Sequence, residues 1–164
     1  YFDLKINIAE YVNQISYCHL ITDEIGKDYE FYLSNNDGAS SSIFEFGELS
    51  IGKNNLWPQK KPMMYLDKIK LSSITIDEFV SRYNIKIEEY NHWVLDLQGA
   101  EFLALKGAKE ALKNCKTMLV EVSDGEVYKN TANYNEIVKY LETFNFKPAN
   151  KIETKHENLL FIKN

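Results

Sequence analysis

The chain has 164 residues, of which 45% are hydrophobic, and this is enough for one domain with a sizeable core. Its 24 acidic and 19 basic residues give a net charge of -5 with no block of like charge, which argues against binding a nucleic acid. No run approaches the roughly 18 apolar residues of a membrane-spanning helix, and no signal segment opens the chain. We therefore expect one soluble domain over residues 1–164, without a membrane partner.

The two cysteines, Cys18 and Cys115, are far apart and have no metal-ligand spacing. Free thiols in a reducing compartment are the simpler interpretation, which predicts a cytoplasmic protein.

The first part of the chain begins with apolar residues at helical spacing, which predict a helix over residues 1–16. No capping residue precedes this helix, as expected for a piece of a longer chain. Two strands around a turn at residues 23–27 follow, and then a loop at residues 35–42 that is rich in Asn, Asp, Gly and Ser. Residues 47–68 contain two prolines and no clean period, which indicates a flexible insertion or a lid.

The middle of the chain contains two changes from strand to helix. A strand ending near Ile76 is followed by a short helix begun by Asp77. Residues 92–115 start as a short apolar run ending in an acid, Asp96, and take helical spacing from Gly99 onward. This second segment predicts a strand, a turn and a helix, with polar side chains gathered at the turn.

The last part of the chain continues this alternation. Residues 117–123 read as a buried strand that carries Glu121, residues 133–146 as a helix opened by a capping box, and residues 157–164 as a last strand. Alternating strands and helices with short connections predict an α/β domain, with a mostly parallel sheet covered by helices on both faces.

The motif "LDLQGAEFLALKGAKEAL" at residues 95–112, followed by "MLVEVSDGEVY" and "YLETFNF", resembles the FkbM family of S-adenosylmethionine-dependent methyltransferases. In that family a strand ends in an aspartate, then come an acid or amide, Gly, a small residue and Glu, and the helix carries a second Gly-Ala pair. Upstream, "LSNNDGASSSIF" and "SITIDEF" are also similar to family segments, so the resemblance covers nearly the whole chain. The matching residues are Asp96, Gln98, Gly99, Ala100, Glu101, Gly107 and Ala108.

The resemblance implies a Rossmann-like class I methyltransferase sheet, S-adenosylmethionine as cofactor, and O-methylation of a hydroxyl on a small-molecule or glycan acceptor. The family's sheet opens with a strand and a glycine-rich turn that approaches the cofactor. No such turn can form here, because the seven glycines stand apart, at Gly26, Gly38, Gly47, Gly52, Gly99, Gly107 and Gly125. We therefore expect an N-terminally truncated sheet, the C-terminal larger part of the domain, which self-associates or takes up a partner segment to complete the sheet.

Three acidic residues are the predicted catalytic groups. Asp96 follows a strand, at the edge where ligands bind in open α/β sheets, and is either the base for the acceptor hydroxyl or a cap for the next helix. Glu121 lies in an apolar strand, where a carboxylate needs a partner or an opening to solvent. Glu101 either joins them or complements the helix dipole. Together they can hold a divalent cation, but no spacing enforces this, so we predict no metal.

The predicted cofactor contacts are Thr22, Asp23 and Leu97. By the resemblance, Thr22 and Asp23 end a strand that passes near the adenine, whereas from the sequence alone an ordinary turn is the better explanation.

The predicted acceptor contacts lie in the two irregular segments of the chain. Asn35, Asn36 and Ser41 can bond acceptor hydroxyls, although turn chemistry explains most of such residues. Trp57 and Tyr65 can stack on a sugar ring or cover a core edge. The three histidines are scattered, which argues against a shared role.

Two other functions remain open from the sequence. The chain is alternatively a non-catalytic methyltransferase-like remnant or interaction module, which keeps the sheet without the cofactor half. A sugar-nucleotide-binding enzyme of similar architecture is a third reading, which no motif here specifically supports.

Overall fold

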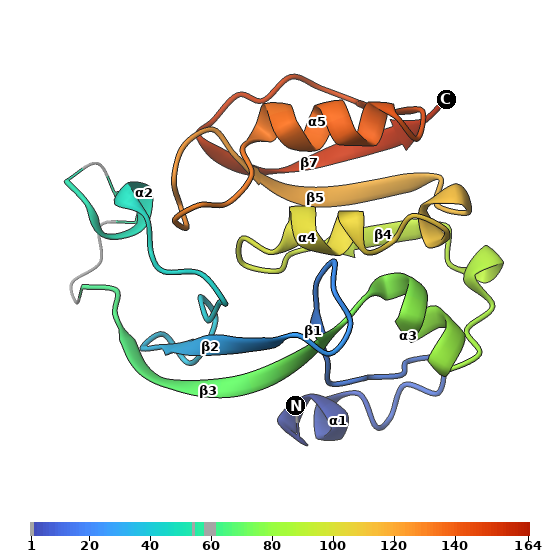
Figure 1. Ribbon diagram of the computed structural model, residues 1–164, viewed down its shortest axis with the longest axis horizontal. Helices are drawn as coiled ribbons and strands as arrows, with labels where there is room; N and C mark the ends of the chain where they lie inside the picture. Colours follow the sequence, from blue (N-terminus) through green and yellow to red (C-terminus); the bar gives the residue numbers. More distant parts are fainter. Residues whose placement is uncertain (1, 54, 58–61) are drawn as a thin grey trace.

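The computed structural model describes residues 2–53, 55–57 and 62–164, and no side chains are described for residues 2 and 3 (Figure 1). In chain order, its elements are α1 (Phe2–Asn7), β1 (Leu20–Ile21), β2 (Asp28–Ser34), α2 (Glu48–Ile51), β3 (Tyr65–Ile74), α3 (Ile76–Arg82), the 3-10 helix η1 (Ile87–Glu89), β4 (His92–Leu95), α4 (Glu101–Lys106), the 3-10 helix η2 (Ala111–Lys113), β5 (Thr117–Ser123), α5 (Tyr134–Glu142), β6 (Phe146–Pro148) and β7 (His156–Lys163).

The strands form two small mixed sheets. One has the order β1-β3-β2 and the other has the order β4-β5-β7-β6. Only β1 with β3 and β4 with β5 are parallel pairs, whereas β2 with β3, β5 with β7 and β6 with β7 are antiparallel. The predicted mostly parallel Rossmann-like sheet, with helices on both faces, is therefore wrong.

The connections between strands explain the error. A parallel pair needs a long crossover, and β4 and β5 have one through α4 and η2. By contrast, β6 and β7 are joined by the short loop of residues 149–155, which suits an antiparallel return. A pattern of strands and helices along the chain does not distinguish these two kinds of connection.

The first predicted helix is shorter than expected, because α1 ends at Asn7. The apolar side chains beyond it have little cover: Val12 is 94% exposed and Ile15 is 70% exposed. An isolated helical turn in water is unstable without packing on an apolar face. The predicted insertion at residues 47–68 contains α2 and the start of β3, and its residues 54 and 58–61 lie outside the described part.

The helix predicted from Gly99 breaks at Gly107, which is the C-cap of α4 and not a mid-helix residue. A Cβ at Gly107 would lie 2.3 Å from the carbonyl oxygen of Thr22. Only a residue without a side chain allows this approach, so α4 packs directly on the backbone that follows β1. The chain then continues into η2, whose first N–H groups bond to the carboxylate of Asp77.

Other elements agree with the sequence. Strand β5 has the predicted bounds, and α5 begins at the capping box of Asn133 and Glu136. Helix α3 begins one residue before the predicted Asp77, with Thr75 as its N-cap. Cys18 is exposed and Cys115 is buried, and both are free thiols.

The main core lies between the four-stranded sheet and the helices α4 and α5 (Figure 1). A second, smaller cluster joins α2 and the segment before it to the loop after β5, and its buried members are Phe46, Leu49, Val127 and Tyr128.

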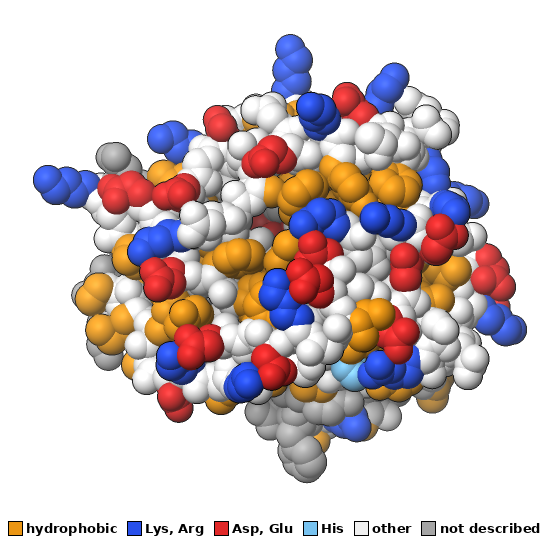
Figure 2. Space-filling view, viewed as in Figure 1, with side chains coloured by type: hydrophobic (Ala, Val, Ile, Leu, Met, Phe, Trp, Pro, Cys, Tyr) orange, Lys and Arg blue, Asp and Glu red, His pale blue; other side chains and the backbone are white. Residues whose placement is uncertain are grey.

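The outer surface carries mixed charge. Figure 2 shows lysine, arginine and acidic side chains interspersed on the face in view. In the described ranges, no helix combines the length and apolar character needed to cross a membrane.

Candidate functional site

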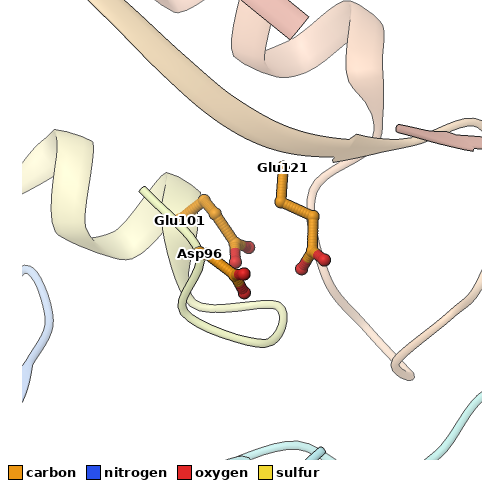
Figure 3. Close-up of side chains that lie close together, drawn as sticks. All are labelled: Asp96, Glu101 and Glu121. Carbon is orange, nitrogen blue, oxygen red and sulfur yellow. The ribbon is translucent and has the colours of Figure 1, made fainter. Parts of the chain in front are cut away.

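Three carboxylates meet where β4 and β5 end (Figure 3). Asp96 directly follows β4, Glu101 opens α4, and Glu121 lies near the end of β5. One carboxylate oxygen from each residue lies within 4.8 Å of the others. Asp96 is exposed, Glu121 is half-buried and Glu101 is buried, so the group runs from the surface into the core.

The strand pairing explains this convergence. β4 and β5 are parallel, with Leu95 opposite Val120, so their carboxyl ends lie at the same edge of the sheet. Asp96 directly follows Leu95, and Glu121 directly follows Val120. The sequence predicted all three acids as site residues, and the structure brings them together.

Glu101 holds the turn that follows Asp96. Its Oε1 accepts hydrogen bonds from the backbone N–H groups of Leu97 at 2.7 Å and Gly99 at 3.2 Å. The turn needs this support, since Gln98 and Gly99 both have left-handed φ values, 52° and 96°. The Leu97 N–H is therefore already bonded, and the predicted cofactor contact at Leu97 has no free backbone donor.

The protonation of Glu101 is unusual for a glutamate. Burial raises the pKa of the Glu101 carboxyl to about 7, while bonds from backbone N–H groups oppose the rise and the charge of Glu121 adds to it. A carboxyl with this pKa takes up or releases a proton near neutral pH.

Gln98 connects the turn to the second cluster. Its side-chain N–H donates to Asp96, its side-chain oxygen accepts from the Tyr128 hydroxyl at 2.7 Å, and its carbonyl accepts from the Ser42 hydroxyl at 2.6 Å. Asp96 does not cap the helix, because the N-cap of α4 is Ala100 and receives no side-chain bond. The position of Asp96 is thus set by Gln98 and leaves its carboxylate exposed.

The residues predicted to contact the adenine lie elsewhere. Thr22 is fully buried, and its hydroxyl bonds to the backbone of Glu24 within the turn. Asp23 pairs with Lys106, at the opposite end of α4 from Glu101. The structure does not bring Thr22 or Asp23 to the three carboxylates.

The polar loop after β2 is largely bonded to itself. Asn36 accepts from Ser34 and donates to Ser40, and Ser41 accepts from the Ser34 N–H. Asn35 bonds to the carbonyl of Pro62. Turn chemistry therefore accounts for the bonds of Asn36 and Ser41, whereas Asn35 ties the loop to the segment before β3. The loop touches the site turn through Ser42 and Gln98.

The two aromatic candidates differ in their surroundings. Tyr65 stacks between Tyr32 and Phe46, with ring centroids 4.9 and 4.1 Å away, and so packs in the second cluster. Trp57 is 40% exposed, and its ring lies 5.0 Å from the His156 ring in a T-shaped contact. Of these two, only Trp57 is brought close to the acidic group.

Sequence reasoning missed His156 and Ser123. The His156 Nε2 lies 3.1 Å from Glu121 Oε1, and its Nδ1 lies 2.9 Å from the Ser123 hydroxyl. These residues are 33 positions apart, and no motif or spacing in the sequence relates them.

Two cavities lie near these elements. A small one, of about 20 Å³, is bordered by Glu101, Glu121, Tyr128 and His156 and has room for a water-sized group. A larger one, of about 750 Å³, lies between the N-terminal segment, α3 and β4 and is lined mainly by apolar side chains such as Ile21, Phe79 and Val94. The acidic group lies beside the small cavity and lines no part of the large one.

The acidic group attracts cations. Three carboxylate oxygens within 4.8 Å are ligands of the kind that hard divalent ions take, and they equally attract an organic cation such as a sulfonium. The absence of a metal stays a prediction from the sequence.

Comparison with known proteins identifies the class to which this fold and site belong. The model of the methyltransferase FkbM domain matches residues 4–148, which is most of the chain. The chain therefore belongs to the FkbM methyltransferase family. Searches of curated proteins and of solved structures gave no match.

Proposed function

We propose that this protein transfers a methyl group from S-adenosylmethionine to a hydroxyl group of a small-molecule or glycan acceptor. The observation that carries the proposal is the convergence of Asp96, Glu101 and Glu121 at the ends of two parallel strands in a chain of the FkbM family. Ligands of α/β proteins commonly bind at this edge of a sheet.

The acidic group fits the charge of the methyl donor. When bound, S-adenosylmethionine supplies an activated methyl group on a positively charged sulfur. Carboxylates near that position would stabilise the cation and exclude anions. The predicted nucleoside contacts fit less well, because Asp23 is paired with Lys106 and the Leu97 N–H is bonded to Glu101.

Asp96 is the best placed of the three to act as the base. Glu101 is occupied by the turn and Glu121 by His156, whereas the Asp96 carboxylate is exposed and bonded only through Gln98. The acceptor oxygen would lose its proton to Asp96 and form a bond to the methyl carbon. The carbon–sulfur bond would break with its electrons remaining on sulfur, so charge and atoms balance.

The test is a methyl-transfer assay with the protein expressed from its complete natural reading frame, wherever that frame begins. The assay uses S-adenosylmethionine labelled in its methyl group and a panel of hydroxylated acceptors that includes free sugars and oligosaccharides. We expect label in an acceptor and loss of that label in the Asp96→Asn variant. Donor binding without transfer to any hydroxyl would count against O-methylation, and failure to bind the donor would favour the non-catalytic alternative.

A further inference from the structure

His156 is fixed at both ring nitrogens. It is the first residue of β7 and lies directly opposite Ser123 in the antiparallel pairing of β5 with β7. Ser123 and Glu121 are two residues apart on β5 and therefore point to the same face of the sheet. As a result, one imidazole bridges the Ser123 hydroxyl at 2.9 Å and the Glu121 carboxylate at 3.1 Å.

The chemistry of these partners determines which nitrogen carries the proton. An ionised carboxylate only accepts hydrogen bonds, so facing an ionised Glu121 favours the proton on Nε2. A serine hydroxyl can donate or accept, so Nδ1 can be either bare or protonated. The contact with Ser123 therefore forms with Nδ1 as acceptor or as donor, while Nε2 faces the Glu121 carboxylate at 3.1 Å.

Among the described residues, His156 is also the one basic side chain in an ion-pair contact with the acidic group, and it carries a charge only when protonated. No Lys or Arg among them forms an ion pair with Asp96, Glu101 or Glu121, and the ion pair of Glu121 is with His156. The side chains of this pair are 16% and 13% exposed, so water screens their contact only in part. Figure 3 shows Glu121 reaching from β5 toward the side where Asp96 and Glu101 lie.

We propose that His156 is a positioning residue of the methyl-transfer site: it fixes the Glu121 carboxylate toward Asp96. This inference rests on the proposed function. His156 itself need not touch the acceptor or the methyl donor, because its effect passes through Glu121. Ser123 completes the arrangement by holding the other side of the ring.

The matched control is His92, at the other end of the same sheet. Its Nδ1 lies 2.6 Å from the Thr117 hydroxyl, and His92 and Thr117 are also paired across neighbouring strands. The two histidines thus share the imidazole–hydroxyl contact, but only His156 adds a carboxylate. His92→Leu should remove the same kind of imidazole–hydroxyl contact, at an exposed position, without affecting the acidic group.

The kinetic experiment compares His156→Leu, His156→Gln and His92→Leu with the parent protein. We expect His156→Leu to lower kcat on the order of 10²-fold, as for a small misplacement of a catalytic group, with little change in KM for either substrate. His156→Gln should recover most of the loss, because its amide N–H can still donate to Glu121. His92→Leu should match the parent. Equal activity in His156→Leu and His92→Leu, or no recovery in a folded His156→Gln, would overturn the inference.

A second measurement does not depend on activity. NMR of the labelled protein reports the proton on each ring nitrogen of His156 and the carbon signal of the Glu121 carboxyl. We expect a protonated Nε2 and a Glu121 signal that moves in His156→Leu but not in His92→Leu. A neutral ring protonated only at Nδ1, or an unmoved Glu121 signal, would overturn the positioning role. If no methyl transfer is found but the NMR result is as expected, the proposed function fails and the coupling of His156 to Glu121 stands.

Discussion

The carboxylate of Glu101 accepts a hydrogen bond from the backbone N–H of Leu97, 2.7 Å away, across the turn that carries Asp96 into position. The same oxygen accepts from the Gly99 N–H. One buried side chain therefore holds the geometry of the turn and also belongs to the acidic group. Changes to Glu101 should therefore affect both the stability of the fold and the dependence of that stability on pH.

Glu101→Ala should destabilise the fold by about 1–3 kcal/mol, because it leaves two partly buried backbone N–H groups without their acceptor. Glu101→Gln should cost less, since its amide oxygen still accepts a hydrogen bond. The free energy of unfolding in urea measures both effects. Glu142→Ala, at an exposed position in α5, is the control and should change stability little. An unchanged free energy in Glu101→Ala would show that the turn does not depend on this carboxylate.

The raised pKa of Glu101 should make stability fall as pH rises. Its folded-state pKa is about 7, against an ordinary value of 4.5 in the unfolded chain, so the folded protein binds more protons than the unfolded chain between these values. The stability from the protonated carboxyl is therefore fully present below about pH 4.5 and is lost as pH rises through about 7. Urea unfolding at intervals from pH 4.5 to 8 should show this decline in the parent and a flatter curve in Glu101→Gln. Parallel curves would contradict the raised pKa.

Asp96→Asn should separate chemistry from structure. The asparagine oxygen can still accept from Gln98, so the unfolding free energy should change little. Turnover should fall by roughly 10²–10⁴ if Asp96 is the general base. The assay uses the complete natural protein, with Asp67→Asn on β3 as a control that should keep its activity. Activity of Asp96→Asn within a few-fold of the parent would remove the catalytic assignment.

The isolated 164 residues should bind S-adenosylmethionine weakly or not at all. The seven glycines are too far apart for a glycine-rich turn, and Asp23 is already paired with Lys106. Isothermal titration calorimetry of the isolated chain and of the protein from the complete natural reading frame makes the comparison. Micromolar binding by the isolated chain would show that these residues contain a complete cofactor site.

The open edge of β4 should promote self-association of the isolated chain. β4 is the first strand in the order of its sheet, and Val94 is 71% exposed beside the large apolar cavity. An exposed apolar edge strand invites pairing with another copy, and a lysine there opposes it. Light scattering over a range of concentrations should show association in the parent and less in Val94→Lys. The control is Leu66→Lys, which places the same charge at a 68% exposed residue of β3. A monomeric parent at high concentration would contradict this prediction.

The elements that the sequence predicted correctly depend on residues that are close together in the chain. The bounds of β5 follow from one short apolar run interrupted only by Glu121, and the start of α5 follows from Asn133 and Glu136, three residues apart. The motif around Asp96 was likewise enough to predict the family that the comparison then showed. The sequence predicted the three acidic site residues because each one follows or interrupts a recognisable pattern of apolar residues.

The direction of the strands and the contacts of the site residues depend on segments that are far apart in the chain. The sequence pattern did not reveal that β7 returns antiparallel to β5, and so the predicted parallel sheet was wrong. That same pairing places His156 opposite Ser123 and against Glu121, a contact between residues with no local relation in the chain. The helix over residues 1–16 also failed for a reason of tertiary structure, because its apolar residues beyond Asn7 found no surface that buries them. Local patterns fix which segments are apolar and where they start, whereas hydrogen-bonded register and packing between distant segments determine which side chains meet.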